Sequence, residues 1–124
     1  ASGTPASELV GPMIERLVSP GLAVDDPPRW AQVADWLAQA PPAGIAWAQR
    51  AMASRPDRFA ALAALPAPGV VVIGSEDVLM PKAEQAQMAE VLGSLIELPC
   101  GHLVPFERPS QTAEILSELI RSAR

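Results

Sequence analysis

The sequence predicts an α/β protein in which a helical segment precedes a strand–helix–strand–helix unit of a parallel sheet. Residues 1–64 are rich in alanine, proline and tryptophan and contain no cluster of β-branched residues. The composition changes near residue 65, and the β-branched run Val70–Ile73 lies between two glycines. A short apolar run without alternation is typical of a strand covered on both faces, as in parallel sheets. We therefore divide the chain into residues 1–64 and 65–124.

Four helices are expected in the first segment, at 7–18, between 26 and 41, at 43–54 and at 57–62. Apolar residues recur at helical spacing in the first of them, including Met13, Ile14 and Leu17. Asp26 is followed by two prolines, which is the composition of an N-cap with proline in the first turn. Pro41 belongs to the proline pair that ends this second helix. All three tryptophans lie in these helices.

The second segment has the pattern of one right-handed crossover unit. Its expected elements are a strand at 70–73, a helix from Pro81 to Leu92, a strand at 94–98 and a last helix that begins at Pro109. Two strands are too few to support a stable parallel sheet, and the outer edge of the first would expose unpaired backbone groups. We therefore expect the rest of the sheet to come from another chain.

Composition and charge exclude several classes of function. With 9 basic and 14 acidic residues the formal net charge is −5, which argues against nucleic acid or an anionic membrane surface as a partner. The single cysteine excludes an intrachain disulfide framework and a cysteine metal cluster. No apolar run approaches the ~20 residues of a membrane span, so we expect a soluble, cytoplasmic protein. No metal or other cofactor is implied.

An acid and the only histidine follow the two expected strands. Asp77 stands just past Val70–Ile73, and His102 stands just past the second strand. Open α/β sheets place catalytic groups at the carboxyl ends of their strands. Asp77 also has a structural interpretation as a helix N-cap or turn residue, and His102 has one as an exposed loop imidazole. No Gly-x-Ser-x-Gly turn occurs in the 124 residues, so the nucleophile that such a pair would serve is missing.

The stretch from Pro66 to Ile120 resembles the C-terminal segment of the α/β-hydrolase superfamily. The matching pieces are Pro68–Asp77, Met80-Pro81, Pro99–Leu103 and Phe106–Pro109. The resemblance implies that Asp77 is the acid and His102 the general base of a Ser-His-Asp triad. It also implies that Glu107 stands at the start of the closing helix, where we expect its carboxylate to hold backbone N–H groups.

The helical segment is similar to the later part of the lid that such enzymes place over the active site. Residues 48–57 resemble the return of the lid into the sheet in esterase-like and lactonase-like members, including cofactor-free haloperoxidase relatives. Residues 1–64 are therefore expected to be a helical lid (cap) segment, and residues 65–124 the C-terminal part of the hydrolase core. The nucleophile elbow, the oxyanion-hole loop and most of the sheet of that family have no counterpart in this sequence.

Four other side chains are considered as candidates: Ser75, Glu76, Cys100 and Trp47. Glu76 is a competing acid, although the resemblance places the role on Asp77. Cys100 is expected to be a packing residue rather than a reactive thiol. Ser75 lacks the flanking glycines of an elbow nucleophile. Among the three tryptophans, Trp47 is our candidate for the acyl pocket, with a place in the core of the lid as the alternative.

Two functions from different classes follow. The first is the C-terminal part of a hydrolase of ester, lactone or related acyl bonds, with a small-molecule acyl substrate and a missing N-terminal half that supplies the nucleophile. An aspartate nucleophile in that half would turn the same base toward dehalogenation or epoxide opening. Alone, the chain is expected to be inactive. The second is a non-catalytic half-domain or homodimerising interaction module whose exposed strand edge pairs with a partner.

Overall fold

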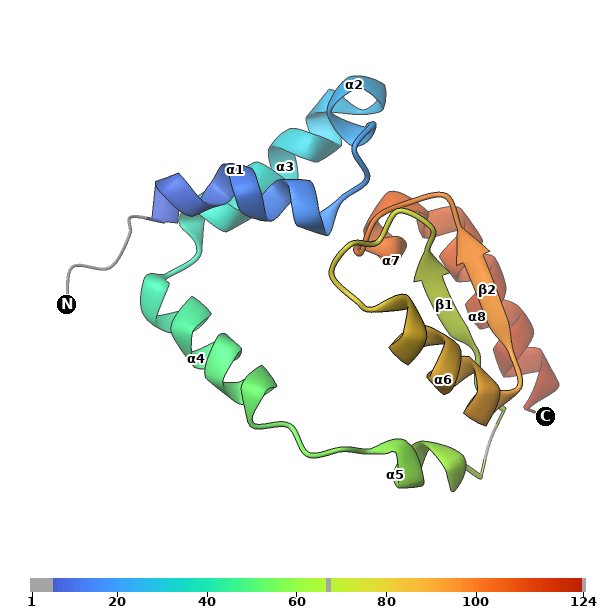
Figure 1. Ribbon diagram of the computed structural model, residues 1–124. Helices are drawn as coiled ribbons and strands as arrows, with labels where there is room; N and C mark the ends of the chain where they lie inside the picture. The colour runs from blue at the N-terminus through green and yellow to red at the C-terminus, as the bar shows by residue number, and fades with distance from the viewer. Residues whose placement is uncertain (1–5, 67, 124) are drawn as a thin grey trace.

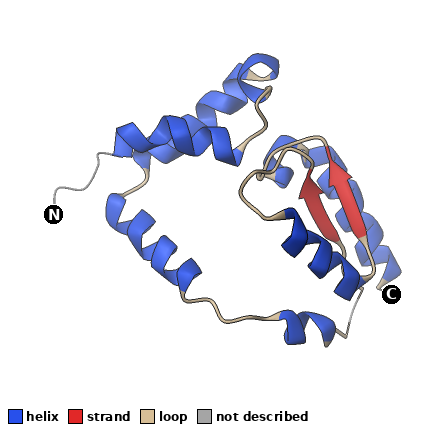
Figure 2. Ribbon diagram, in the orientation of Figure 1, coloured by secondary structure: helices blue, strands red, loops and turns tan. Residues whose placement is uncertain are grey.

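The computed structural model describes residues 6–66 and 68–123, which form mainly helices and one two-stranded parallel sheet (Figure 2). The first three helices of the chain lie beside the sheet unit, and the chain passes through the next two helices before it enters the sheet (Figure 1). None of the described helices combines the length and the apolar content needed to cross a membrane.

The helical segment has helices at the four expected places and one further short helix. In chain order they are α1 (Ala6–Leu17), α2 (Leu22–Asp25), α3 (Pro27–Gln39), α4 (Pro42–Ala53) and α5 (Phe59–Ala63). Asp26 caps α3 as expected, because its carboxylate accepts the backbone N–H of Arg29 at 3.0 Å. The sequence does not predict α2, since a single turn is too short to show a helical period.

The sheet unit has the expected order, with one short helix added. Its elements are β1 (Val71–Gly74), α6 (Lys82–Leu92), β2 (Leu95–Leu98), α7 (Val104–Glu107) and α8 (Pro109–Ser122). The strands are parallel, with Val71 opposite Leu95 and Gly74 opposite Leu98. Gly93 ends α6 in the left-handed conformation, at φ 72°. α6 and α8 lie on opposite faces of the strands (Figure 1). The predicted α/β fold class, a helical segment followed by a strand–helix–strand–helix unit with parallel strands, is confirmed.

The apolar core lies between helices rather than on the sheet. Its buried members come from α1, α2, α3 and the residue after α1, and are Ile14, Val18, Leu22 and Val33. Leu103 and Phe106, before and within α7, pack against this cluster. The strands are less covered: residues 71–73 of β1 are half-buried, and Leu95 of β2 is 48% exposed. The expected cover on both faces of the first strand is therefore present but incomplete.

Candidate active site

The two loops that follow the strands meet at the carboxyl end of the sheet. The backbone N–H of Ser75 donates to the carbonyl of Leu98 at 2.9 Å. The backbone N–H of Glu76 donates to the carbonyl of Cys100 at 3.0 Å. These bonds hold the loop after β1 against the turn after β2, and the acid and the histidine lie just beyond them.

Two glycines allow this close approach. A Cβ on Gly74 would overlap the carbonyl oxygens of Cys100 and Gly101. A Cβ on Gly101 would lie 2.5 Å from the carbonyl carbon of Val18 and 2.6 Å from the backbone nitrogen of Ser19. Neither position admits a side chain unless the backbone moves. The Gly-His turn is therefore clamped between the end of β1 and the residues that follow α1.

Asp77 and His102 form a hydrogen-bonded pair. Nδ1 of His102 lies 3.0 Å from Oδ2 of Asp77. Because an ionised carboxylate only accepts, Nδ1 carries the proton and the neutral imidazole presents an unprotonated Nε2. The aspartate side chain is 6% exposed, whereas the histidine side chain is 35% exposed. A buried acceptor behind a half-exposed imidazole is the arrangement that a general base needs.

The carboxylate of Asp77 is held on both oxygens. Oδ1 accepts the backbone N–H groups of Leu79 and Met80 at 2.8 and 3.2 Å, and Oδ2 accepts Nε2 of Gln85 at 3.3 Å as well as the histidine. Burial alone raises the pKa of Asp77, but the hydrogen bonds from His102 and the two backbone N–H groups outweigh it and lower the pKa below 3.8. Asp77 is thus a turn residue and the partner of the histidine at once.

Glu107 does not hold the start of α8, and that expectation is wrong. Its side chain is 2% exposed. Oε1 accepts the backbone N–H of Gly101 at 2.9 Å, and Oε2 accepts the backbone N–H and the hydroxyl of Ser19 at 3.0 and 2.5 Å. α8 begins at Pro109 without a side-chain cap. The difference arises because Glu107 is the last residue of α7, and its carboxylate reaches back to the histidine turn.

The three tryptophans occupy different environments. Trp30 packs against the core cluster of the helical segment. Trp36 lies with its ring centroid 5.2 Å from that of Phe106. Trp47 is 69% exposed on α4, which Figure 1 shows away from the carboxyl ends of the strands. The structure therefore does not bring Trp47 to the Asp77–His102 pair, and its place in an acyl pocket stays a prediction.

Cys100 is a packing residue, as expected. Its side chain is fully buried, and burial, with the charge of Glu107 adding to it, raises the pKa of the thiol to about 11. A thiol that stays protonated at neutral pH is a poor nucleophile.

Within residues 6–66 and 68–123, no group of three or more His, Cys, Asp or Glu side chains is arranged to hold a metal ion.

Comparison with known proteins identifies the family. A sequence model of the alpha/beta hydrolase family matches residues 2–115. The chain belongs to the α/β hydrolase family. No curated protein matches it.

A solved esterase structure is similar to nearly all of the chain. It is a thermophilic esterase from Thermogutta terrifontis with malate bound, with a TM-score of 0.80 and 30% sequence identity. The similarity covers 94% of this chain and 44% of the esterase. The chain therefore spans less than half the length of that enzyme.

Sequence reasoning missed two residues around the pair of this α/β hydrolase chain. Gln85 is 4% exposed and contacts Asp77 from α6. Its signal was a polar residue in helical register with Met88 and Leu92, on the half-buried stripe of α6. Ser19 contacts Glu107 from the turn after α1, and nothing in its local sequence marks that contact.

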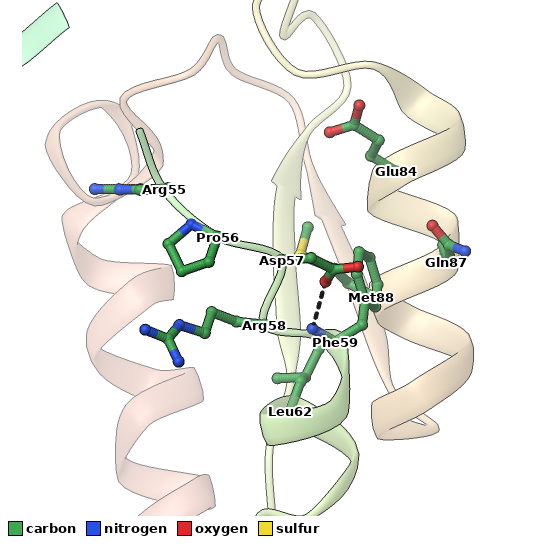
Figure 3. Close-up of a pocket in the computed structure, with 9 residues that line it drawn as sticks. All are labelled: Arg55, Pro56, Asp57, Arg58, Phe59, Leu62, Glu84, Gln87 and Met88. Carbon is green, nitrogen blue, oxygen red and sulfur yellow. Dashed lines mark hydrogen bonds between the residues drawn. The ribbon is translucent and has the colours of Figure 1, made fainter. Parts of the chain in front are cut away.

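A surface concavity of about 560 Å³ lies elsewhere on this α/β hydrolase chain (Figure 3). It is lined by residues 55–59, Leu62, Glu84, Gln87 and Met88. Asp57 there accepts the backbone N–H of Phe59 at 2.8 Å, at the start of α5. Neither Asp77 nor His102 lines the concavity. We take the hydrogen-bonded pair as the candidate site, because it alone joins an acceptor, a proton carrier and a half-exposed ring nitrogen.

Proposed function

We propose that this chain is the C-terminal part of a hydrolase of ester, lactone or related acyl bonds. Asp77 is its triad acid and His102 its general base. The observation that carries the proposal is the 3.0 Å contact between Oδ2 of Asp77 and Nδ1 of His102 in a chain of the α/β hydrolase family. The order of acid before histidine along the chain agrees with the order in this fold.

The chemistry of the pair follows from its protonation. Nε2 of His102 takes the proton of a serine hydroxyl while the serine oxygen bonds to the acyl carbon, and the imidazolium then gives that proton to the leaving oxygen. Asp77 stabilises the imidazolium through Nδ1 without taking its proton. Water repeats the same steps on the acyl-serine and releases the acid. The pair thus serves both halves of the reaction.

The nucleophile and the oxyanion donors are proposed to lie outside these 124 residues, in an N-terminal half of the same fold. Support comes from the 44% share of the esterase that the chain covers and from the missing elbow motif. The half-buried β1 has a free edge in the described sheet, which a further strand would pair. Residues 1–64 would then form the lid, with Trp47 facing a small acyl substrate. The cytoplasmic location stays a prediction.

Hydrolysis of p-nitrophenyl esters by the protein that joins this chain to its nucleophile tests the proposal. We expect His102→Ala to lower kcat/KM by about 10⁴-fold or more, and Asp77→Asn by about 10³–10⁴-fold. Glu76→Gln is the matched control, because it changes the exposed neighbouring acid. It should leave kcat/KM within about twofold. Turnover that survives His102→Ala at the wild-type level would contradict the proposal.

A second candidate is a non-catalytic half-domain or homodimerising module. It is favoured by the same open sheet. Leu95 of β2 is 48% exposed, and the neighbouring strand β1 has a free edge. A symmetric dimer would cover that edge with a second copy of the chain. Native mass separates the two candidates, because this one predicts copies of the 13.0 kDa chain alone and no ester turnover.

A further inference from the structure

Glu107 is a buried carboxylate whose hydrogen-bond donors lie where the histidine turn meets the turn after α1. It is 2% exposed, and its two oxygens accept three donors, from Gly101 and Ser19. Burying an ionised carboxylate is costly unless such donors satisfy it. These donors belong to the histidine turn and to the turn after α1, which indicates a role beyond the start of a helix.

His102 is held on both sides of its backbone by residues near the end of α1. On its N-terminal side, Gly101 donates to Glu107, which in turn holds Ser19. On its C-terminal side, the backbone N–H of Leu103 donates to the carbonyl of Leu17 at 3.1 Å. The position of the imidazole therefore depends on the docking of the helical segment against the turn.

We propose that Glu107 is a positioning residue for His102. Through Ser19 it couples the orientation of the imidazole to the position of α1 against the histidine turn. The proposal rests on the proposed role of His102 as general base. Glu107 does not touch the reacting atoms. It fixes the peptide before the histidine, so that Nδ1 meets Oδ2 of Asp77 and the Nδ1–H tautomer is favoured.

Glu107→Gln tests this with little change in side-chain shape. A glutamine has one acceptor oxygen where glutamate has two, so either Gly101 or Ser19 loses its partner. His102 is the only histidine, so its imidazole ¹⁵N signals in the labelled 124-residue chain are unambiguous. At about pH 8.5 these signals report the ratio of Nδ1–H to Nε2–H tautomers of the neutral ring.

We expect Glu107→Gln to lower that ratio roughly three- to tenfold, the change that goes with the net worth of one hydrogen bond. The pKa of Asp77, read from its carboxyl ¹³C signal, should rise because the bond from His102 weakens. Glu114→Gln on the exposed side of α8 is the matched control and should change neither. A folded Glu107→Gln protein with the wild-type tautomer ratio and the wild-type Asp77 pKa would overturn the proposal.

Ser19→Ala decides the question if Glu107→Gln does not fold. It removes only the hydroxyl donor and keeps the backbone N–H bond to Glu107. We expect a smaller fall of the tautomer ratio, about twofold, in the same direction. An unchanged ratio in folded Ser19→Ala would then reject the coupling to α1. Neither the tautomer ratio nor the pKa of Asp77 requires ester turnover. A negative result in these measurements can therefore be told apart from a negative result in the hydrolase assay.

Discussion

The first three helices and the sheet of this molecule differ in how completely their apolar side chains are buried. α1, α2 and α3 surround four buried apolar side chains, and residues of α7 pack against them. The two strands keep half-buried apolar residues and a free edge on β1. The covered region holds the histidine turn, through Ser19 and Leu17, whereas the open region carries Asp77 and His102. The Asp77–His102 pair is thus held from the side of α1, while the sheet beside it keeps a free edge.

Gly74→Ala should have the largest effect, because Gly74 lies in the junction between these two regions. This junction is the contact of Gly74 with Cys100 and Gly101, and of Gly101 with Val18 and Ser19. Its Cβ would overlap the carbonyl oxygens of Cys100 and Gly101, so the end of β1 must move. We expect a loss of about 3 kcal/mol or more in the free energy of unfolding, measured with urea. Gly44→Ala in α4 is the control, since its Cβ meets nothing nearer than 3.9 Å. It should stabilise by up to ~1 kcal/mol. Equal stability of Gly74→Ala and wild type would refute the close approach.

Labelling of Cys100 sharpens the comparison, because the thiol lies inside the junction. With its pKa raised to about 11, the thiolate at pH 8 is about 100-fold rarer than for an ordinary thiol, and the side chain is fully buried. We expect iodoacetamide to modify the folded chain at least ~100-fold more slowly than the urea-unfolded chain. Rapid modification of the folded chain would mean that the turn opens readily.

The pH dependence of stability tests how firmly Asp77 is held. Its folded pKa lies below the unfolded value of ~3.9, so its contribution is fully present above that pH and is lost as the pH falls through the folded pKa. Asp77→Asn should cost about 1–3 kcal/mol near pH 6, with a smaller difference from wild type near pH 3. Urea unfolding at both pH values measures it. A difference that grows on acidification would have the wrong sign for this account.

Trp47→Ala is expected to have the smallest effect on the fold. The side chain is 69% exposed, so the free energy of unfolding should change by no more than ~0.5 kcal/mol. If Trp47 faces the acyl group of the substrate in the whole enzyme, KM should rise while stability stays the same. A large loss of stability would instead place Trp47 in the core of the lid.

Patterns that act within a few residues predicted most of the elements. Asp26 with two prolines marked the start of α3, and Gly93 marked the end of α6. The β-branched run 70–73 marked β1, which the structure places one residue later. The contact of Asp77 with His102 was also predictable, because parallel strands end at one edge of a sheet. Local chemistry decides each of these features.

Contacts between distant segments were not predictable in the same way. The bond from Ser19 to Glu107 spans 88 residues, and the sequence around Glu107 pointed instead to the adjacent helix. Gln85 gave only a weak signal, as one polar residue on a half-buried helix stripe. α2 and α7 are single turns, formed where the chain must reverse against the core. Packing that only the folded chain creates decides these features.

The most direct test of the central claim uses the protein purified from the cells that make it. Its native mass and its p-nitrophenyl ester turnover are measured together, with a fluorophosphonate to trap the nucleophile. The account predicts a species larger than the 13.0 kDa chain, a trapped serine on a peptide outside these 124 residues, and turnover abolished by His102→Ala. A species composed only of copies of this chain, with no turnover, would contradict it.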